Sequence, residues 1–529
     1  MDASEGARVG VLVVGAGPAG LVLACELARR GTAVRVVDRL TEPTEESRAI
    51  LVHARSLEMM QRIGTVDALV ASGTAATAAE FHADGGVLGR VPLDTVDSPF
   101  PFSVSTAQTE TERVLTERLA ELGVTIERGA ELVALEQNDD EVRSTLRHPD
   151  GQEETCTSSY VAGTDGSHST VRHQVGTKLE GSFKGRRFLL GDVEGEYDLD
   201  RDAFHTFLSS DAGPLLVFPM AGSRVRVIAM LDDGDEASTL EHVQAVCDRR
   251  AHGMRLRSAH WITVFEIHHA QVAAYRHGRV FLAGDAAHVH SPAGGQGMNT
   301  GMQDAFNLGW KLALAAAGQA APGLLDSYHD ERHPVAARVI EASTRVTDAG
   351  TVHNELARRL RNHAIHLATA LEPIRMRLAD GTEEIDVAYR DSPIVARHGH
   401  HHHSHGPHPG ESAPDVPGVQ PALHTVLAAG TGHTALYVAG SDGPSQRLAL
   451  DDDVRHVLVG DGVAAAAEAQ PRTYDAVVAD PERAVAERYG LGGHGGLVLV
   501  RPDGYIGLHT RFGDDDAVSA YLACIRASR

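Results

Sequence analysis

The side chains and spacings best suited to chemistry lie in residues 284–299, which read GDAAHVHSPAGGQGMN. Nothing in this stretch resembles a nucleophile paired with its base. Asp285 instead ends a short apolar strand, where an acid can accept hydrogen bonds from a polyol. Pro292 stiffens the next turn, and the glycines after it leave backbone amides free to meet a flat ligand. The stretch therefore predicts a ligand site that is shaped mainly by the backbone.

A helix is expected directly after this loop. The segment NTGMQDAFNLGWKLALAAAG has Asn299 or Thr300 as its predicted cap and Gly318 as its predicted end. The positive N-terminal end of such a helix faces whatever lies against the loop. Together with bare amides it can stabilise an anion, such as the N1–C2=O edge of a reduced flavin, without a titrating side chain.

The first glycine turn in chain order lies near the N-terminus, where GAGPAG at 15–20 follows the apolar run VGVLVV and precedes a helical segment. Gly15 permits the tight turn, Gly17 lets a pyrophosphate approach, and Gly20 lets helix pack on strand. Asp38 ends the next strand, where an acid bonds ribose hydroxyls. This order predicts a dinucleotide site rather than a turn without ligand, but it does not separate NAD from FAD.

The second motif in chain order lies between this turn and the stretch 284–299, which is the third motif, and the three together carry a family resemblance. Residues 160–172, YVAGTDGSHSTVR, hold an Asp-Gly pair followed by Ser169 and Arg172. The three motifs in this order resemble the single-component class A FAD-dependent aromatic hydroxylases, the superfamily of para-hydroxybenzoate and phenol hydroxylases. The resemblance covers residues 8–345 strongly and is greatest to hydroxylases that tailor aromatic polyketides.

The resemblance implies FAD as the bound cofactor and supplies a set of contact residues. The ADP half of FAD is expected at Gly15, Gly17, Pro18, Ala19, Gly20, Asp38 and Arg39. The ribityl chain and the isoalloxazine are expected at Asp285, Pro292, Gly295, Gln296, Gly297, Met298 and Asn299. Arg48, Gln108 and Asp165 complete the set, although Arg48 and Gln108 are also compatible with an ordinary surface ion pair or a helix cap.

The chemistry implied by the resemblance is hydroxylation of an aromatic ring. NAD(P)H binds transiently and reduces the flavin, in agreement with the absence of a second GxGxxG turn. Reduced flavin captures O2 as a C4a-hydroperoxide, which attacks an electron-rich phenol. No general base is evident, because Ile50 near Arg48 is apolar, and His205 is the nearest titrating candidate.

The expected substrate is a polycyclic, polyketide-like phenol or quinone. The segment 204–230 is rich in apolar residues and offers no obvious carboxylate clamp, because Arg224 and Arg226 are interpreted as facing solvent. The candidate lining residues, for which a place in the core is the alternative, are Phe204, Phe207, Phe218, Pro219 and Met230.

Other functions stay open. A catabolic phenol-type hydroxylase and a monooxygenase that inactivates an aromatic antibiotic would use the same site. A flavin halogenase needs a WxWxIP element, and neither Trp261 nor Trp310 lies in one. A redox-dead FAD-binding protein belongs to a different class and would not turn over NAD(P)H.

The elements that position these residues predict an α/β fold. A GxGxxG Rossmann-like FAD domain is expected from 1–175 plus 276–395, with an inserted substrate-binding β-sheet at 176–275 that residues 76–106 join. The sheet includes a hairpin that turns at 221–223. Residues 414–529 are expected to form a thioredoxin-like domain without CxxC. The segment 396–413, which contains HGHHHHSHGPH, is predicted to be a linker, with a metal site as the alternative.

Composition excludes several partners. The net charge of -24 at pH 7 disfavours nucleic-acid binding. The N-terminus does not resemble a signal peptide, and no stretch of about 20 apolar residues predicts a membrane span. Cys25, Cys156, Cys247 and Cys524 lie far apart, which is typical of a reducing cytoplasm and argues against a zinc site. The expected partners are an aromatic small molecule and O2; no metal is expected, and a homodimer is left open.

Overall fold

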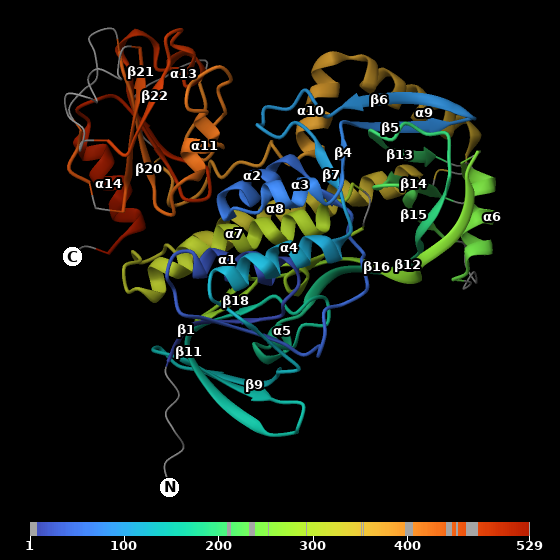
Figure 1. Ribbon diagram of the computed structural model, residues 1–529, viewed down its shortest axis with the longest axis horizontal. Helices are drawn as coiled ribbons and strands as arrows, with labels where there is room; N and C mark the ends of the chain where they lie inside the picture. Colours follow the sequence, from blue (N-terminus) through green and yellow to red (C-terminus); the bar gives the residue numbers. More distant parts are fainter. Residues whose placement is uncertain are drawn as a thin grey trace.

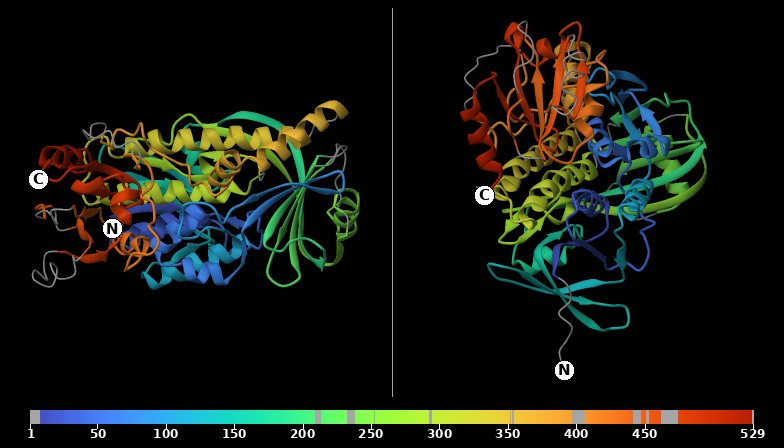
Figure 2. Two further views of the ribbon diagram at one scale, coloured as in Figure 1. Left: turned by 90° about the horizontal axis from the view of Figure 1, so that it is seen from above. Right: turned by 60° about the vertical axis from the view of Figure 1, so that its left-hand side comes forward.

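The computed structural model has a mixed α/β fold with several sheets (Figure 1). It describes residues 8–208, 213–231, 238–251, 253–291, 294–350, 352, 354–396, 406–440, 447–450, 453–461 and 474–527. The C-terminal sheet and the second large sheet lie at opposite ends of the molecule (Figure 2). No helix within these described ranges is long and apolar enough to cross a membrane.

The first large sheet contains β1, the strand before the N-terminal glycine turn, and β2, the strand that ends at Asp38. Its strands run in the order β17-β18-β11-β1-β2-β8, and β10 and β9 extend it from β11. The bounds are β1 Val9–Val14, β2 Val34–Asp38, β8 Ile126–Arg128, β9 Glu131–Gln137, β10 Val142–Arg147, β11 Glu153–Gly163, β17 Arg276–His277 and β18 Val280–Leu282. β1 runs parallel to β2 and β11 and is buried on both faces, which explains its continuous apolar sequence.

The second large sheet combines an early segment with a later one. Its order is β19-β16-β12-β15-β14-β13-β5-β6. The bounds are β5 Ala78–Ala83, β6 Gly86–Pro92, β12 Leu179–Glu196, β13 Ala203–Leu208, β14 Pro214–Pro219, β15 Arg224–Met230, β16 Arg255–Val272 and β19 His288–Val289. β5 and β6 enter through a parallel pairing of β5 with β13. The hairpin predicted around 221–223 is confirmed by the antiparallel pairing of β14 with β15.

The two faces of this second sheet pack against different partners. The inner face is defined here by the apolar cluster that also contains Ile50 and Leu51; it carries Phe188, Leu190, Phe204, Leu216, Phe218 and Ile228. The outer face is covered by helix α6 (Leu240–Arg250) and carries Leu189, Phe207, Leu215, Val217 and Val227. Alternate residues of each strand thus serve opposite faces, as a pleated strand requires.

Further helices precede the C-terminal sheet. Their bounds are α1 Pro18–Ala28, α2 Ala54–Ile63, α3 Val66–Ala71, α4 Gln108–Glu121, α5 Thr170–Gln174, α7 Gln296–Ala316, α8 Asp326–Gly350, α9 Glu355–Ala370 and α10 Glu372–Thr382. A small sheet joins β3 (Leu51–Val52), β7 (Ser103–Ser105) and β4 (Thr74–Ala76). In Figure 1, α1, α7 and α8 lie side by side across the middle of the molecule.

The C-terminal sheet has the order β22-β21-β20-β23-β24. Its elements are α11 Leu423–Ala428, β20 Thr434–Val438, β21 Arg455–Gly460, β22 Ala476–Ala479, α13 Ala484–Arg488, β23 Gly496–Val500, β24 Ile506–Thr510 and α14 Asp515–Ile525. Most of the His-rich segment lies outside the described residues, which resume at residue 406. The prediction of a linker at 396–413 therefore falls largely outside the described residues and stays a prediction.

Buried charges join the C-terminal sheet to the central helices. Glu331 of α8 accepts hydrogen bonds from Lys311 of α7 at 2.7 Å and from Arg501, just after β23, at 2.6 and 2.9 Å. Arg501 also bonds Asp503, which accepts from the indole nitrogen of Trp310 at 3.1 Å. These side chains are almost completely buried. The network fixes the C-terminal sheet to the helix that follows the second glycine loop.

Candidate functional site

The glycines of the first glycine turn have two different roles. Gly15 and Gly20 are closely packed by other atoms, whereas Gly17 has open space beside its Cα. Gly15 has φ +103°, and a Cβ there would lie 2.5 Å from the Thr164 carbonyl oxygen. A Cβ at Gly20 would lie 1.9 Å from the Gly15 carbonyl oxygen. A Cβ at Gly17, the residue before α1, would meet nothing within 4 Å. Bare backbone at the N-terminus of α1 is therefore open to a ligand, as an approaching pyrophosphate requires.

Residues that flank this turn are arranged around the same opening. Pro18 is the first residue of α1, and Ala19 faces Gly284 of the third motif, where a Cβ would lie 3.2 Å from the Ala19 Cβ. Asp38, at the end of β2, accepts hydrogen bonds from the backbone amides of Ala16 at 2.7 Å and Leu40 at 2.8 Å. These two bonds fix the carboxylate beside the turn. Arg39 is exposed.

The second motif has a positioning role. Asp165 accepts from the Ser169 hydroxyl and, at 3.0 Å, from the Val171 amide, so both carboxylate oxygens are engaged at the start of α5. Burial raises the pKa of Asp165. Arg172, which is buried, donates to the carbonyl oxygen of Ala286 at 3.0 Å. The second motif thus holds the backbone next to Asp285.

The side chain of Asp285 is accessible to solvent although many protein atoms lie nearby. It lies in the 3-10 turn Gly284–Ala286, and its side chain is exposed. Its pKa is nevertheless raised, because nearby protein atoms reduce its hydration, while His288 and Arg48 lower it. Arg48 is itself exposed and bonds Glu46 at 3.0 Å. An accessible carboxylate in a crowded setting fits a partner that brings hydroxyl donors and displaces water.

Gln108 orders the segment that carries Arg48. Its side-chain oxygen accepts from the Ala49 amide at 3.2 Å, and its side-chain nitrogen donates to Glu112 at 2.9 Å. Its own amide donates to the Ser47 hydroxyl at 2.9 Å. The structure therefore brings Gln108, Arg48 and Asp285 into one region, with Gln108 acting on the neighbouring backbone.

Helix α7 begins earlier than the sequence predicted. Gly295 is its N-cap, with φ +69°, and Gln296 is its first residue. Asn299 and Thr300 lie inside the helix, so the prediction of either as the cap is wrong. The glycines allow the left-handed turn that starts the helix, a signal that outweighed the capping preference of asparagine and threonine. Pro292 lies outside the described residues.

Asn299 links α7 to β3 and to His53, which follows that strand. Its side-chain nitrogen donates to the carbonyl oxygens of Leu51 at 2.9 Å and Gly295 at 3.0 Å, and its oxygen accepts from the His53 amide at 3.0 Å. Gln296 donates to the Gly381 carbonyl oxygen at 2.8 Å. Gly297 is open except for His290, and Met298 packs on the core. The side chains of Asn299 and Gln296 thus hold the loop in place.

A buried chain of polar groups behind this loop was missed by the sequence analysis. His53 Nε2 lies 3.1 Å from the Gly294 carbonyl oxygen, and His53 Nδ1 lies 2.7 Å from the Ser103 hydroxyl. Ser103 lies 2.6 Å from Glu383 Oε1, and the Ala54 amide donates to Glu383 Oε2 at 2.6 Å. All of these side chains are buried. A lone histidine, serine and glutamate in different parts of the chain gave no motif to detect.

The hydrogen bonds limit where the protons of this chain lie. The Gly294 carbonyl only accepts, so a neutral His53 carries its proton on Nε2, and its Nδ1 accepts from Ser103. When His53 is charged, Ser103 donates to an ionised Glu383 at 2.6 Å; when His53 is neutral, Nδ1 uses the Ser103 proton and Glu383 donates to Ser103 as a neutral acid. Burial supports the neutral state, because it raises the pKa of Glu383 to about 7 and lowers the pKa of His53 to about 4.

The position of Arg226 differs from the sequence interpretation of the second sheet. Arg226 is completely buried and donates to Asp192 at 2.8 Å, to the Ala49 carbonyl oxygen at 2.8 Å and to Ser47 at 3.0 Å. The interpretation that it faces solvent is wrong; its buried carboxylate partner Asp192 lies on the neighbouring strand. Arg224 is partly exposed and also bonds Asp192.

The sheet also separates the candidate substrate residues. Phe204 and Phe218 are on the inner face, and Met230 packs against that cluster. Phe207 is on the outer face. His205 follows Phe204 and has its ring near Phe207, so it also points to the outer face. Pro219 ends β14, where its carbonyl oxygen accepts from Ser105 at 2.7 Å. This placement gives no support to His205 as a base at the flavin.

Comparison with known proteins adds an independent line of information. Residues 8–343 match the family model described as FAD binding domain. The 6-methylpretetramide 4-monooxygenase of Streptomyces rimosus is 37% identical over 511 residues, which cover 94% of this chain and 90% of that protein.

Two solved structures match nearly the whole chain. The OxyS anhydrotetracycline hydroxylase from Streptomyces rimosus has a TM-score of 0.74 and 30% identity, and the match covers 98% of this chain and 99% of that one. The Diels-Alderase PyrE3 of the pyrroindomycin pathway also has a TM-score of 0.74, with 27% identity and coverage of 98% and 99%.

Proposed function

Because the chain belongs to the FAD binding domain family and is an FAD-dependent aromatic monooxygenase, we propose that it hydroxylates a polycyclic phenolic compound of polyketide type. The observation that carries this proposal is similarity along almost the full chain to a monooxygenase whose named substrate is 6-methylpretetramide. NAD(P)H is the proposed transient electron donor.

The chemistry of the second sheet supports a large apolar substrate. Its inner face carries Phe204 and Phe218 at positions that approach Ile50 and Leu51, the residues next to the loop before α7. A ring system that buries about 300 Å² of apolar surface gains roughly 7 kcal/mol before entropy costs, with no ion pair required. The buried Arg226 is committed to Asp192 and does not serve as a clamp for a benzoate carboxylate.

We propose that FAD occupies the opening between the two glycine loops. Gly15, Gly20 and Asp38 shape the turn, and Gly17 with Pro18 presents the N-terminus of α1 to the pyrophosphate. Asp285 accepts from the ribityl hydroxyls, and the backbone from Gly295 to Met298 lies against the isoalloxazine edge. Bound FAD supplies the activation of O2, while these backbone groups exclude water and stabilise negative charge on the ring.

The cofactor assignment is tested by releasing the flavin. We expect the pure protein to be yellow and acid precipitation to leave FAD in the supernatant, at one FAD per chain. Flavin in the pellet would contradict noncovalent binding, and FMN in the supernatant would contradict the assignment of a dinucleotide site.

The substrate assignment is tested with three compound classes: monocyclic phenols, hydroxybenzoates, and tricyclic or tetracyclic phenols and quinones. We expect the polycyclic class to stimulate NAD(P)H oxidation and to yield a product with one added oxygen, with little H2O2. Coupled turnover of a hydroxybenzoate alone would place the enzyme among catabolic hydroxylases. Conversion of a polycycle without NAD(P)H consumption would instead indicate a non-oxidative role such as that named for PyrE3.

The arrangement of the remaining parts is part of the same proposal. We propose an FAD domain from 1–175 and 276–395, and a substrate sheet from 176–275 joined by 76–106. We propose that residues 414–529 form a thioredoxin-like domain used for packing, since a central sheet with helices is present there without CxxC. A cytoplasmic location and a homodimer are proposed on the basis of the dispersed free cysteines and the C-terminal domain, respectively.

A further inference from the structure

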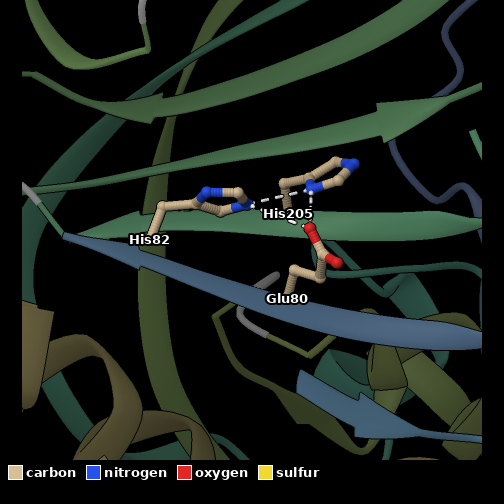
Figure 3. A group of neighbouring side chains, drawn as sticks. All are labelled: Glu80, His82 and His205. Atoms are coloured by element: carbon tan, nitrogen blue, oxygen red, sulfur yellow. Dashed lines mark hydrogen bonds and ion pairs between the residues drawn. The ribbon is translucent and has the colours of Figure 1, made fainter. Parts of the chain in front are cut away.

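Three potential ligand atoms converge on the outer face of the second sheet (Figure 3). Glu80 and His82 lie on β5, and His205 lies on β13 directly opposite Glu80 in the parallel register. His82 Nε2 is 3.0 Å from His205 Nδ1, and Glu80 Oε2 is 3.5 Å from His82 Nε2 and 3.3 Å from His205 Nδ1. Figure 3 shows the three groups pointing toward one another.

These separations match the edges of a coordination polyhedron. With bonds of about 2.1 Å, neighbouring ligand atoms of a tetrahedral zinc ion lie roughly 3.4 Å apart. A triangle with the observed sides lets one ion sit at bonding distance from all three atoms, slightly above their plane. The side chain of His205 is 0% exposed, whereas 12% of His82 and 11% of Glu80 remain accessible, which leaves a path for the ion and for a water as fourth ligand.

Surrounding groups orient His205 as a ligand. Its Nε2 lies 2.8 Å from the Asp200 carbonyl oxygen, which only accepts, so the proton of the neutral ring is on Nε2. Its Nδ1 therefore carries the lone pair, which lies 3.0 Å from His82 Nε2 and 3.3 Å from Glu80 Oε2 and is available to an ion that takes the place of the His82 proton. A carbonyl that fixes the tautomer of a histidine ligand is a common feature of metal sites.

We propose that Glu80, His82 and His205 bind one divalent transition-metal ion, with Zn²⁺ as the preferred ion. Two imidazoles and one carboxylate suit zinc and its neighbours in the first transition row better than Mg²⁺ or Ca²⁺, which favour all-oxygen sites. The site departs from the sequence expectation of no metal. That expectation had no motif to use, because His82 and His205 are separated by 123 positions.

Arg90 modifies the site without filling it. Its guanidinium donates to Glu80 Oε1 at 2.6 Å and to Asp200 at 2.7 Å. It therefore holds the carboxylate and leaves Oε2 directed at the two histidines. Its positive charge also disfavours a nearby cation, which lowers the affinity below that of the same three ligands without Arg90.

The position of the site indicates a structural role. It joins β5, from the early part of the chain, to β13, from the later part. Among the described strand pairs of this sheet, this pair alone is parallel. On the opposite face the same strands carry Ala79 and Phe204 of the inner cluster. A bound ion would fix this pair of strands behind the proposed substrate face. The proposal stands independently of the substrate assignment.

The test must remove competition from the His-rich segment. All proteins are therefore full-length, FAD-loaded chains in which every histidine from 398 to 408 is changed to serine. After EDTA treatment and buffer exchange, Zn²⁺ binding is measured by equilibrium dialysis with elemental analysis, and thermal melting is followed with and without Zn²⁺. We expect one tightly bound Zn²⁺ per chain and a higher Tm when it is present.

Variants connect the bound ion to these residues. His205→Ala and His82→Ala should each weaken Zn²⁺ binding about 100-fold or more and abolish the Zn²⁺-dependent rise in Tm. Glu80→Gln keeps the size of the side chain and serves if an alanine variant does not fold. His260→Ala, which alters an exposed histidine on β16 of the same sheet, is the matched control and should bind Zn²⁺ as the parent does. Absence of tight binding in the parent, or unchanged binding in all three site variants, would overturn the proposal.

Discussion

The turn between β1 and α1 and the loop before α7 are both rich in glycine, yet they are held in place differently. Close packing of Gly15 and Gly20 against each other and against Thr164 shapes the first turn. The second loop is held by hydrogen bonds from His53 and from Gln296, which bonds Gly381. A steric fit cannot be relaxed by titration, whereas a hydrogen-bonded support can. The two halves of the proposed FAD site should therefore fail in different ways.

The largest effect is expected at the first turn. Gly20→Ala places a Cβ 1.9 Å from the Gly15 carbonyl oxygen, so we expect a loss of about 3 kcal/mol or more in the free energy of unfolding. Gly17→Ala is the matched control, because its Cβ enters open space. Its free energy of unfolding should lie within about 1 kcal/mol of the parent value, whereas its affinity for FAD should be lower. Denaturant unfolding and FAD titration separate the two results. Equal stability of both variants would remove the distinction between packing and open glycines.

The next effect concerns the acid between the two loops. Asp285→Ala should weaken FAD binding roughly 10- to 150-fold, which corresponds to the loss of a charged hydrogen bond of about 1.5–3 kcal/mol. Because the side chain is exposed, the melting of the apo-protein should change little. Titration of apo-protein with FAD measures the affinity. An unchanged affinity would show that Asp285 is not the ribityl acceptor.

The support behind the second loop is tested with Glu383. Glu383→Ala leaves the Ser103 hydroxyl and the Ala54 amide without their partner and should cost about 1–3 kcal/mol. Glu383→Gln offers an N–H donor to Ser103 and an oxygen to Ala54, so it should retain most of the stability and FAD affinity. If glutamine is as damaging as alanine, Glu383 acts as a carboxylate, and the neutral-acid assignment is wrong.

The smallest effect is a pH dependence. The pKa of Glu383 is raised to about 7 in the folded state, above the usual value of about 4.3 for an unfolded chain. Its contribution to stability is therefore complete below pH 4 and is lost as pH rises through 7. Between pH 6 and pH 8 the free energy of unfolding of the parent should fall by about 1 kcal/mol more than that of Glu383→Gln. Denaturant unfolding at each pH measures this difference. A parallel pH profile for the two proteins would contradict this assignment.

Sequence reasoning succeeded where the signal was local. The run from Val9 to Val14, the strand that ends at Asp38 and the hairpin around 221–223 all appear as predicted, because each is specified by neighbouring residues. It failed where local glycines outweighed a preferred helix cap and where a distant contact decides the burial of a side chain. The start of α7 moved to Gln296, and Arg226 found a buried partner on another strand.

The missed parts of the site share a physical cause. His53, Ser103 and Glu383 meet only after three separate segments have packed, and nothing in their local spacing indicates it. The same holds for His205, whose side of the sheet depends on the register of β13 with β5. Pattern reading can therefore locate the backbone that receives FAD, but not the side chains that hold this backbone in place.

The buried charges between α7, α8 and the C-terminal sheet also set an order of events during synthesis. Glu331 leaves the ribosome 170 residues before Arg501, the guanidinium that it binds. Until then, an acidic group in the centre of the molecule lacks one of its partners, and burying it incompletely paired is costly. Complete pairing of Glu331 on α8 therefore waits for nearly the whole chain. The charge network between α7, α8 and the C-terminal sheet can thus be completed only when translation is almost finished.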